Sequence, residues 1–286
     1  MAKSALLKSS LAKKYWMALT GLFLCLFLVG HLAGNLQLIF GDASAFNEYA
    51  LFMTTNPAVK VLSYVTYISI LFHAIDGIVL TIQNKKARPI GYAKNNAAAN
   101  SSFSSRNMAV LGTLLLVFIV THMVNFWAKM HFDKAMPLQK IEVKMEGQQG
   151  QPGESFTYYK TLQLNPIQGG PLDTRYVDQG QIEVKGTSFF YKGTDIKVAD
   201  GYKDLHKITI EFFKDPKLGL VYTLLYVLAM VVLGFHLSHG FKSAFQSLGV
   251  NNPKINCTIK GIGYLMAYVV PALFAIIPLY IHFVIK

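Results

Sequence analysis

The sequence predicts an all-α membrane protein, a bundle of five transmembrane helices with a long β-rich insertion between the third and fourth helices. Three observations lead to this fold class. The 286 residues are 52% hydrophobic and 15% charged, and the apolar residues form five long blocks. Basic residues gather at alternate ends of those blocks, and a polar segment of alternating pattern follows the third. We therefore expect three regions, 1–130, 131–214 and 215–286.

Each apolar block is long enough to cross a bilayer as a helix, which takes roughly 20 residues. The first block is longer than the apolar core of a cleaved signal, roughly 7–15 residues, and no small-residue cleavage site follows it. We expect it to remain as an anchor. The expected spans are Tyr15–Phe40, Ala58–Ile82, Asn107–Met130, Leu218–Phe241 and Ile262–Ile285.

The net charge of +12 predicts the orientation of these spans. The segment 129–217 holds 13 basic and 12 acidic residues, whereas the rest of the chain holds 14 basic and 3 acidic residues. This excess lies before the first block, between the second and third, and after the fourth. Positive charge beside apolar helix ends indicates the cytoplasmic side rather than a nucleic-acid site. The N-terminus is expected inside, and the insertion and the C-terminus are expected outside.

The insertion, 131–214, differs in kind from the rest of the chain. Its runs "KIEVKM", "QIEVKG" and "TDIKVAD" alternate between polar and apolar residues and are separated by segments rich in turn residues. Period-2 alternation predicts strands, so we expect a small β-rich cap or a set of hairpins. The segment is too short and too polar for a large core of its own. No internal repeat is apparent in the sequence.

Five of the eight histidines lie within spans, where ionisable side chains are costly and usually face the bundle interior. At about 1.5 Å per residue, His31 lies about 24 Å and His122 about 21 Å from the inner end of their helices. His73 lies about 22 Å from the outer end of its helix, and His236 and His239 lie deeper in the same half. The histidines therefore form two levels, His31 with His122 outside and His73 with His236 or His239 inside.

Two histidines from facing helices at one level can supply both axial ligands of a haem iron, so two levels predict two haems. Neighbouring glycines would leave room for the haem planes; they are Gly30, Gly34, Gly77, Gly234 and Gly240. For any single position, a packed histidine and ordinary Gly-x-x-x-Gly helix contact are the alternative. A zinc or proton-relay site fits less well, because Asp76 is the only acidic residue within a span.

These motifs resemble those of a known family. The runs "KKYWMALTGLFLCLFLVGHLAGNLQ", "LFHAIDGIVLTIQNKKARP", "VTHMVNFW" and "GFHLSHGFKSAFQSLGV" are similar, in this order, to the di-haem cytochrome b subunits (b558 type) of bacterial succinate:quinone oxidoreductases. The separation of His31 and His73 by 42 residues is also similar. The resemblance covers the membrane part, and the insertion departs from it, because relatives join these helices by a short loop.

The resemblance implies that His31 and His122 hold the distal haem b and that His73 and His239 hold the proximal one. Depth alone slightly favours His236, which stays the alternative fourth ligand. The chain would then be a membrane anchor that passes electrons between an iron–sulfur subunit and a quinone, with menaquinone as the expected kind. A separate flavoprotein subunit would carry the succinate or fumarate chemistry.

The same resemblance implies a location in the bacterial inner membrane, with the N-terminus cytoplasmic and the C-terminus periplasmic. The flavoprotein and iron–sulfur subunits would bind the cytoplasmic face, and lipid and quinone would complete the partners. No nucleic acid is expected. The physiological direction and a higher oligomer of the complex stay open.

Electrons at the outer level need an acceptor there, and the candidate quinone residues are Glu48, Asn35, Gln37, Asn125 and Trp127. Glu48 follows His31 by 17 residues, and relatives resembling this chain use a carboxylate in roughly that place for quinone protonation. A carboxylate can deliver or accept the protons that quinone chemistry requires. A solvated loop carboxylate is the alternative, as is a quinone near the proximal haem. Asn35 and Asn125 could also orient the neighbouring histidines.

Two competing functions remain. One is a haem-free transporter or channel lined by histidines, which a reduced-minus-oxidised spectrum would distinguish. The other is the b-type cytochrome anchor of a hydrogenase or formate dehydrogenase, which the co-purifying subunits would distinguish.

Overall fold

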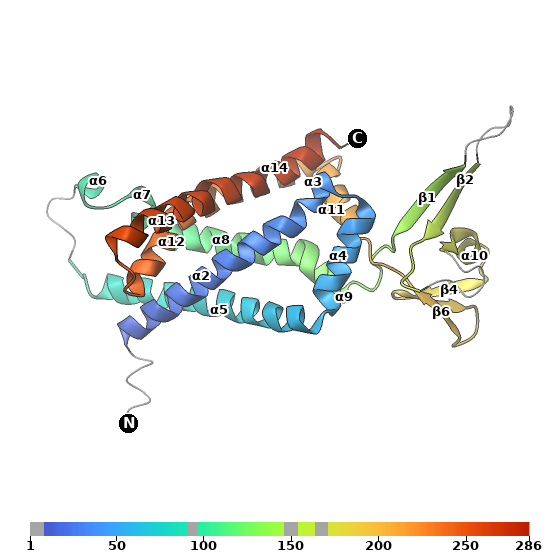
Figure 1. The fold of residues 1–286 in the computed structure, drawn as a ribbon, viewed down its shortest axis with the longest axis horizontal. Coiled ribbons are helices and arrows are strands. Elements are labelled where there is room, and N and C mark those ends of the chain that lie inside the picture. Colours follow the sequence, from blue (N-terminus) through green and yellow to red (C-terminus); the bar gives the residue numbers. More distant parts are fainter. Residues whose placement is uncertain (1–8, 91–95, 146–153, 164–170, 286) are drawn as a thin grey trace, which may run out of the picture. The chain divides into compact units, whose positions relative to one another are not determined.

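The computed structural model describes residues 9–90, 96–145, 154–163 and 171–285, and most of them are helical (Figure 1). Five helical stretches are long and apolar enough to cross a membrane, which confirms the five predicted spans and makes the chain a multi-pass membrane protein. They are Ser10–Phe40, Pro57–Lys86, Met108–Phe132, Gly219–Ser247 and Pro253–Phe283.

The chain divides into two compact units. The first comprises Met1–Phe40, Asn56–Thr121 and Phe212–Lys286, and the second comprises Gly41–Thr55 and His122–Glu211. One boundary falls inside the third span, directly before His122. The first unit is a helix bundle. The second unit carries the strands and a helix that, in the sequence, follows the first span and precedes the second.

The first unit is built from membrane helices and short connecting helices. Local signals mark where they begin: Asn56 caps the second span with its side chain, and Pro57 follows at the first helical position. The helices are α2 (Ser10–Asn35), α3 (Gln37–Phe40), α5 (Pro57–Lys86), α6 (Ala97–Asn100), α7 (Phe103–Arg106), α8 (Met108–His122), α12 (Gly219–Ser247), α13 (Pro253–Tyr264), the π-helix η2 (Leu265–Val269) and α14 (Val270–Phe283).

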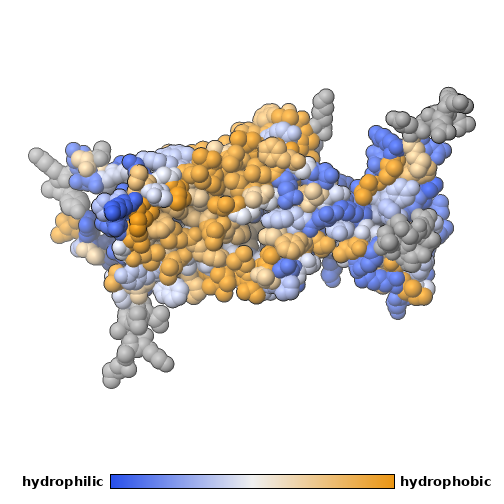
Figure 2. Space-filling model, in the orientation of Figure 1, coloured by the Kyte–Doolittle hydropathy of each residue, from blue (hydrophilic) through white to orange (hydrophobic). Residues whose placement is uncertain are grey.

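Within this unit α2 packs against α5 and α12, and α12 packs against α14. Helix α12 also approaches η2 closely at Gly234, where an added Cβ would lie 2.8 Å from the carbonyl oxygen of Ala267. Large apolar side chains such as Leu26, Val61 and Tyr64 are exposed instead of buried. Figure 2 shows hydrophobic surface over α2, α5 and α14. Small residues inside and large apolar residues outside are typical of helices that pack in lipid.

The described residues of the second unit form five helical elements and six short strands. Its helical elements are α4 (Ala43–Thr55), the π-helix η1 (Met123–Ala128), α9 (Lys129–Phe132), α10 (Thr174–Asp178) and α11 (Leu205–Lys214), of which the last ends in the first unit. One antiparallel sheet contains β1 (Lys140–Met145), β2 (Glu154–Tyr159) and β3 (Leu172–Asp173), and the other contains β4 (Ile182–Lys185), β5 (Ser188–Tyr191) and β6 (Lys197–Asp200).

The prediction of a β-rich insertion is therefore not supported, because the described part of residues 131–214 forms two small sheets. Turns with positive φ at Gly180, Gly186 and Gly193 border strands β4 and β5, and each strand described between residues 171 and 214 has at most four residues. The described residues of the insertion form a small hydrophobic core. Its buried residues are Leu138, Leu172, Ile182, Phe189, Val198 and Ala199.

The two sheets begin with equivalent hairpins, a repeat that was not apparent in the sequence. Strands β1 and β4 share the residues Ile-Glu-Val-Lys, and β2 and β5 share Ser-Phe. The equivalent cross-strand pairs are Val143 with Phe156 and Lys144 with Ser155 in the first hairpin, and Val184 with Phe189 and Lys185 with Ser188 in the second. The connecting segment is longer in the first hairpin, so the shared residues are spaced differently along the sequence in the two hairpins.

Helix α4 was expected as a loop, and it is instead held by buried polar contacts inside the second unit. The side-chain nitrogen of Asn47 donates to Asp204 at 2.8 Å, and its oxygen accepts from the backbone nitrogen of His206 at 2.9 Å. The Gln139 amide donates to the hydroxyl of Ser44 at 3.0 Å. These contacts hold α4 against the first and last segments of the insertion.

Candidate functional site

Two of the predicted histidines meet inside the first unit. The rings of His73 on α5 and His236 on α12 have centroids 6.2 Å apart and planes inclined by 69°. Each ring faces a glycine of a further helix: an added Cβ would lie 3.1 Å from His73 Cε1 at Gly21 of α2, and 3.7 Å from His236 Cε1 at Gly112 of α8. Four membrane helices therefore converge at this pair.

The hydrogen bonds of His73 indicate which of its nitrogens is available. Its Nδ1 lies 3.2 Å from the backbone oxygen of Met17 and 3.3 Å from the Thr20 hydroxyl, which itself donates to the Trp16 carbonyl at 2.7 Å. A carbonyl oxygen can only accept, so Nδ1 carries the proton and donates. The lone pair of Nε2 is then the one offered to a metal, in the arrangement usual for a histidine ligand.

His236 and His239 differ in their surroundings. The Nδ1 atom of His236 is buried and has no hydrogen-bond partner among the described residues, a costly state for a polar atom. The Nε2 atom of His239 lies 3.2 Å from the hydroxyl of Ser243, one turn along the same helix. The geometry therefore favours His236 as the partner of His73, the alternative that helical depth alone slightly favours over the His239 implied by the resemblance.

At the outer level, His31 of α2 lies between two aromatic rings in the first unit. It stacks on Phe27 at 5.3 Å between centroids and lies 5.7 Å from Phe274 of α14. The predicted neighbour Asn35 donates to the His31 carbonyl at 2.8 Å and lies 3.5 Å from both ring nitrogens. Gln37 opens α3, directly after the break in the helix at Leu36.

The other outer residues belong to the second unit. His122 is the last residue of α8, and its ring lies 5.4 Å from that of Phe126. The π-helix η1 follows at once and contains Asn125 and Trp127, whose ring stacks on His131 at 4.7 Å. Single π-helical turns within α-helices frequently occur at functional sites. Since His31 and His122 lie in different units, their pairing stays a prediction.

Glu48 lies on α4 and forms an ion pair with Lys160, 112 residues away in the insertion. The ammonium group of Lys160 also lies 5.0 Å from the ring centroid of Tyr202. The Lys160 side chain is 15% exposed and the Glu48 side chain 56% exposed, so the lysine is the anchored partner. No local signal in the sequence indicates this pairing.

The glycines that the sequence singled out are not those that touch the paired rings. Gly30 and Gly77 have nothing within 4 Å of an added Cβ, and Gly234 serves helix packing. Gly21 and Gly112 supply the clearance around His73 and His236, and neither is a sequence neighbour of a histidine. Only the contact between helices identifies them.

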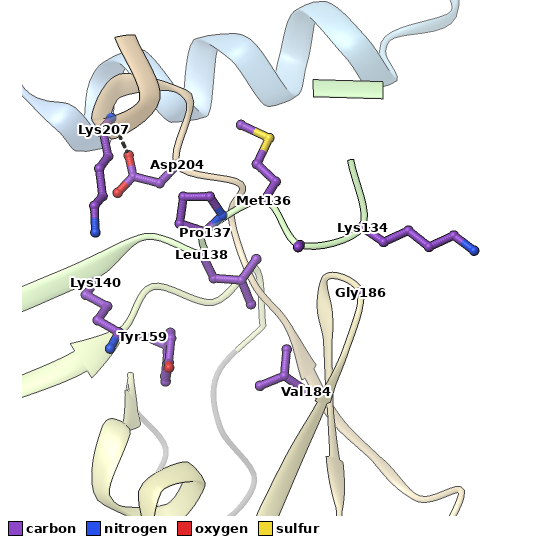
Figure 3. Close-up of a pocket in the computed structure, with 11 residues that line it drawn as sticks. Lys134, Met136, Pro137, Leu138, Lys140, Tyr159, Val184, Gly186, Asp204 and Lys207 are labelled. Carbon is purple, nitrogen blue, oxygen red and sulfur yellow. Dashed lines mark hydrogen bonds between the residues drawn. The ribbon is translucent and has the colours of Figure 1, made fainter. Parts of the chain in front are cut away.

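Two clefts lie within the second unit, and none of the predicted site residues lines either of them. One, of about 520 Å³, is drawn in Figure 3, where Lys140, Lys207 and Val184 surround it and Asp204 accepts from the backbone of Lys207. The other, of about 360 Å³, is lined by residues that include Asn47. The lining of the first cleft combines lysines with apolar side chains, and the lining of the second also includes His131, Asp200 and Lys203.

Among the described residues, no group of three or more His, Cys, Asp or Glu side chains is placed to hold a metal ion. A haem iron takes two axial ligands from the protein, so a histidine pair is sufficient for it. Comparisons with family models, curated proteins and solved structures found no match. The function is therefore inferred from the residues and their geometry.

Proposed function

We propose that this chain is the di-haem cytochrome b subunit of a succinate:quinone oxidoreductase, the family that its membrane motifs resemble. The observation that carries the proposal is the His73–His236 pair inside a bundle with five spans. A metal bound at about 2 Å to one nitrogen of each imidazole places the two ring centroids about 6 Å apart. The observed separation is 6.2 Å, and the tautomer of His73 offers Nε2.

In this proposal His73 and His236 hold the proximal haem, and His31 and His122 hold the distal one. Bound haem supplies one-electron transfer across the membrane. The Met17 carbonyl fixes the orientation of the His73 ring and increases its basicity as a ligand. Asn35 restrains the backbone beside His31. The succinate or fumarate chemistry belongs to a flavoprotein subunit.

The proposed orientation follows the distribution of positive charge. Lys85 and Lys86 end α5, and Lys254 and Lys260 lie on α13, which marks one face as cytoplasmic. That face would bind the iron–sulfur subunit and, through it, the flavoprotein. The second unit would lie in the periplasm of a bacterium, and a quinone, menaquinone in the first instance, would exchange electrons near the outer haem.

Haem content and spectra test the proposal directly. The purified chain should contain close to two b-type haems, visible in a reduced-minus-oxidised spectrum. His236→Ala should remove one haem and spare the other, whereas His239→Ala, three residues away on the same helix, should keep both. Absence of haem from the purified chain would eliminate the proposal. Loss of a haem in His239→Ala alone would make His239 the ligand.

Co-purification separates this proposal from other cytochrome anchors. An affinity tag at the N-terminus should recover a flavoprotein and an iron–sulfur protein with succinate dehydrogenase or fumarate reductase activity. Recovery of hydrogenase or formate dehydrogenase subunits would assign the chain to the competing class of anchor.

A further inference from the structure

Strand β1 is an edge strand with an exposed apolar side. It pairs with β2 on one side, and no described strand lies along residues 141–145 on the other. Figure 1 shows β1 at the outside of its sheet, and Figure 2 shows hydrophobic surface over it, bordered by hydrophilic surface. Val143 is 40% exposed and Met145 is 56% exposed. An exposed edge of this kind is a ready template for another strand.

The equivalent hairpin of the second sheet shows how its own apolar side is covered. Ile182 and Phe189 are buried in the core of the second unit, whereas their counterparts Ile141 and Phe156 are only partly buried. Strand β4 is also an edge strand, but it is four residues long and ends in the turn at Gly186. Val184 is 41% exposed, like Val143, so the two hairpins differ in the burial of the isoleucine and the phenylalanine and in the length of the edge strand.

The charge pattern of β1 identifies the partner. When two copies of β1 pair antiparallel about a two-fold axis at Val143, Glu142 of each copy lies opposite Lys144 of the other. Ile141 lies opposite Met145, and Val143 lies opposite itself. Opposite charges in directly facing positions stabilise an antiparallel pair, and apolar residues share the other face. The strand is complementary to itself in this register.

Neighbouring registers lack this complementarity. A two-fold axis at Glu142 would place Glu142 opposite Glu142 and Lys140 opposite Lys144. An axis at Lys144 would place two lysines face to face. A two-fold axis that passes between two residues, instead of through one, would place charged residues opposite apolar ones, because successive side chains point to opposite faces. Axes at Ile141 and Met145 would also set a lysine opposite a glutamate, but they would pair at most three residues of β1. The axis at Val143 is the one that pairs the five residues 141–145 with charge opposite charge and apolar opposite apolar.

We propose that β1 forms a continuous antiparallel sheet with β1 of a second copy of this chain, paired about Val143. The contact is isologous, as expected for a symmetric dimer. It uses only the edge strand, and so it stands independently of the proposed electron-transfer function.

Charge reversal tests the register. Glu142→Lys puts a lysine opposite Lys144, and Lys144→Glu puts a glutamate opposite Glu142, so each variant alone should raise the dimer dissociation constant by about tenfold or more. Mixing the two variants should restore dimers, because each supplies the charge that the other now lacks. The double variant Glu142→Lys/Lys144→Glu should also dimerise. The measurement is native mass spectrometry of the full-length chain in detergent, with its co-purifying subunits.

The second hairpin supplies the matched control. Glu183→Lys and Lys185→Glu make the same changes in the same four-residue sequence and should leave the oligomeric state unchanged. Recovery on mixing would exclude misfolding as the cause of the monomeric variants, since misfolded chains would not regain a partner. A parent chain that is monomeric, or single variants that dimerise as well as the parent, would overturn the proposal. Failure of the mixture to form mixed dimers would do the same.

Discussion

A single imidazole, that of His73, is held by contacts from one neighbouring helix. Met17 and Thr20 of α2 lie within hydrogen-bonding distance of its Nδ1, and Gly21 of the same helix leaves space for its Cε1. Because these three residues lie within little more than one turn, α2 both orients the ring and sets how closely the helices approach. The position of the ring therefore depends on residues that carry no ligand chemistry themselves.

Gly21→Ala tests this dependence. The new Cβ would lie 3.1 Å from His73 Cε1, so the ring must move, and overpacking of this kind costs about 1–3 kcal/mol. Gly77→Ala is the control on α5, where an added Cβ meets nothing within 4 Å and alanine gains up to about 1 kcal/mol of helix propensity. In unfolding measurements in detergent, the stability of Gly21→Ala should be lower than that of the parent, and the stability of Gly77→Ala should equal or exceed it. Equal stability of the two variants would contradict the contact.

Asp173 offers a pH-dependent test in the second unit. It caps α10, and hydrogen bonds from the Arg175 guanidinium and backbone hold the pKa of its carboxyl below its usual range. A pKa that is lower in the folded state contributes stability above the unfolded pKa of about 3.9, and this contribution is lost as the pH falls through the folded pKa. Asp173→Asn should therefore be less stable than the parent at pH 6, and the difference should close below about pH 4.

Hydrogen-exchange protection of residues 172–185, referenced to unfolded peptide at each pH, measures this difference. Asp195→Asn, at an exposed turn, is the control and should leave protection unchanged. A difference between Asp173→Asn and the parent that stayed constant from pH 6 to pH 3 would show that the charge of Asp173 is not responsible.

At the scale of elements, α4 shows what local signals in a sequence can and cannot reveal. The Asp42 side chain accepts from the backbone of Ala45 and so caps the helix, and Asn56 caps the helix that follows. Both are ordinary signals of a helix start. The segment was nevertheless expected as a loop, since it lies between two apolar blocks. Its burial depends on Asn47 and on partners more than 150 residues away, which local signals do not indicate.

Placement of Glu48 on this helix allows a sharper test of its role, which rests on the proposed function. If Glu48 transfers protons to or from quinone, Glu48→Gln should slow quinone turnover by about 100-fold or more, since positioned acids and bases contribute on this scale. Both haem signals and dye-linked succinate oxidation should survive. Glu211→Gln is the matched control, because Glu211 is an exposed carboxylate of the second unit that also pairs with a lysine. Unchanged quinone kinetics in Glu48→Gln would leave Asn35 and Asn125 as the next candidates.

The choice between His236 and His239 shows why part of the site could not be predicted from sequence. Length and hydropathy alone indicate the five spans, and a rise of about 1.5 Å per residue places both histidines in the inner half of α12. They differ by three residues, and which one faces α5 depends on the rotation of α12 about its axis. That rotation is set by packing, including the close approach of Gly234 to Ala267. Periodicity carries no information about such a contact.

At the scale of the whole molecule, five crossings by the apolar helices of the described residues would place the two chain ends on opposite sides of the membrane. The positive-inside rule then predicts that the loop between α12 and α13 is cytoplasmic and that the second unit lies outside. Asn251 in that loop and Thr194 in the turn before β6 are both exposed and suited to cysteine labelling.

In a Cys257→Ser background, which removes the exposed native thiol, Thr194→Cys should react with a membrane-impermeant maleimide in intact cells. Asn251→Cys should react only after the membrane is opened or in inside-out vesicles. Cys25 is buried and should not be labelled in either preparation. The Cys257→Ser variant without an added cysteine therefore gives the baseline. Labelling of Asn251→Cys but not Thr194→Cys in intact cells would reverse the orientation. It would also move the proposed docking face for the iron–sulfur subunit to the side that carries the second unit.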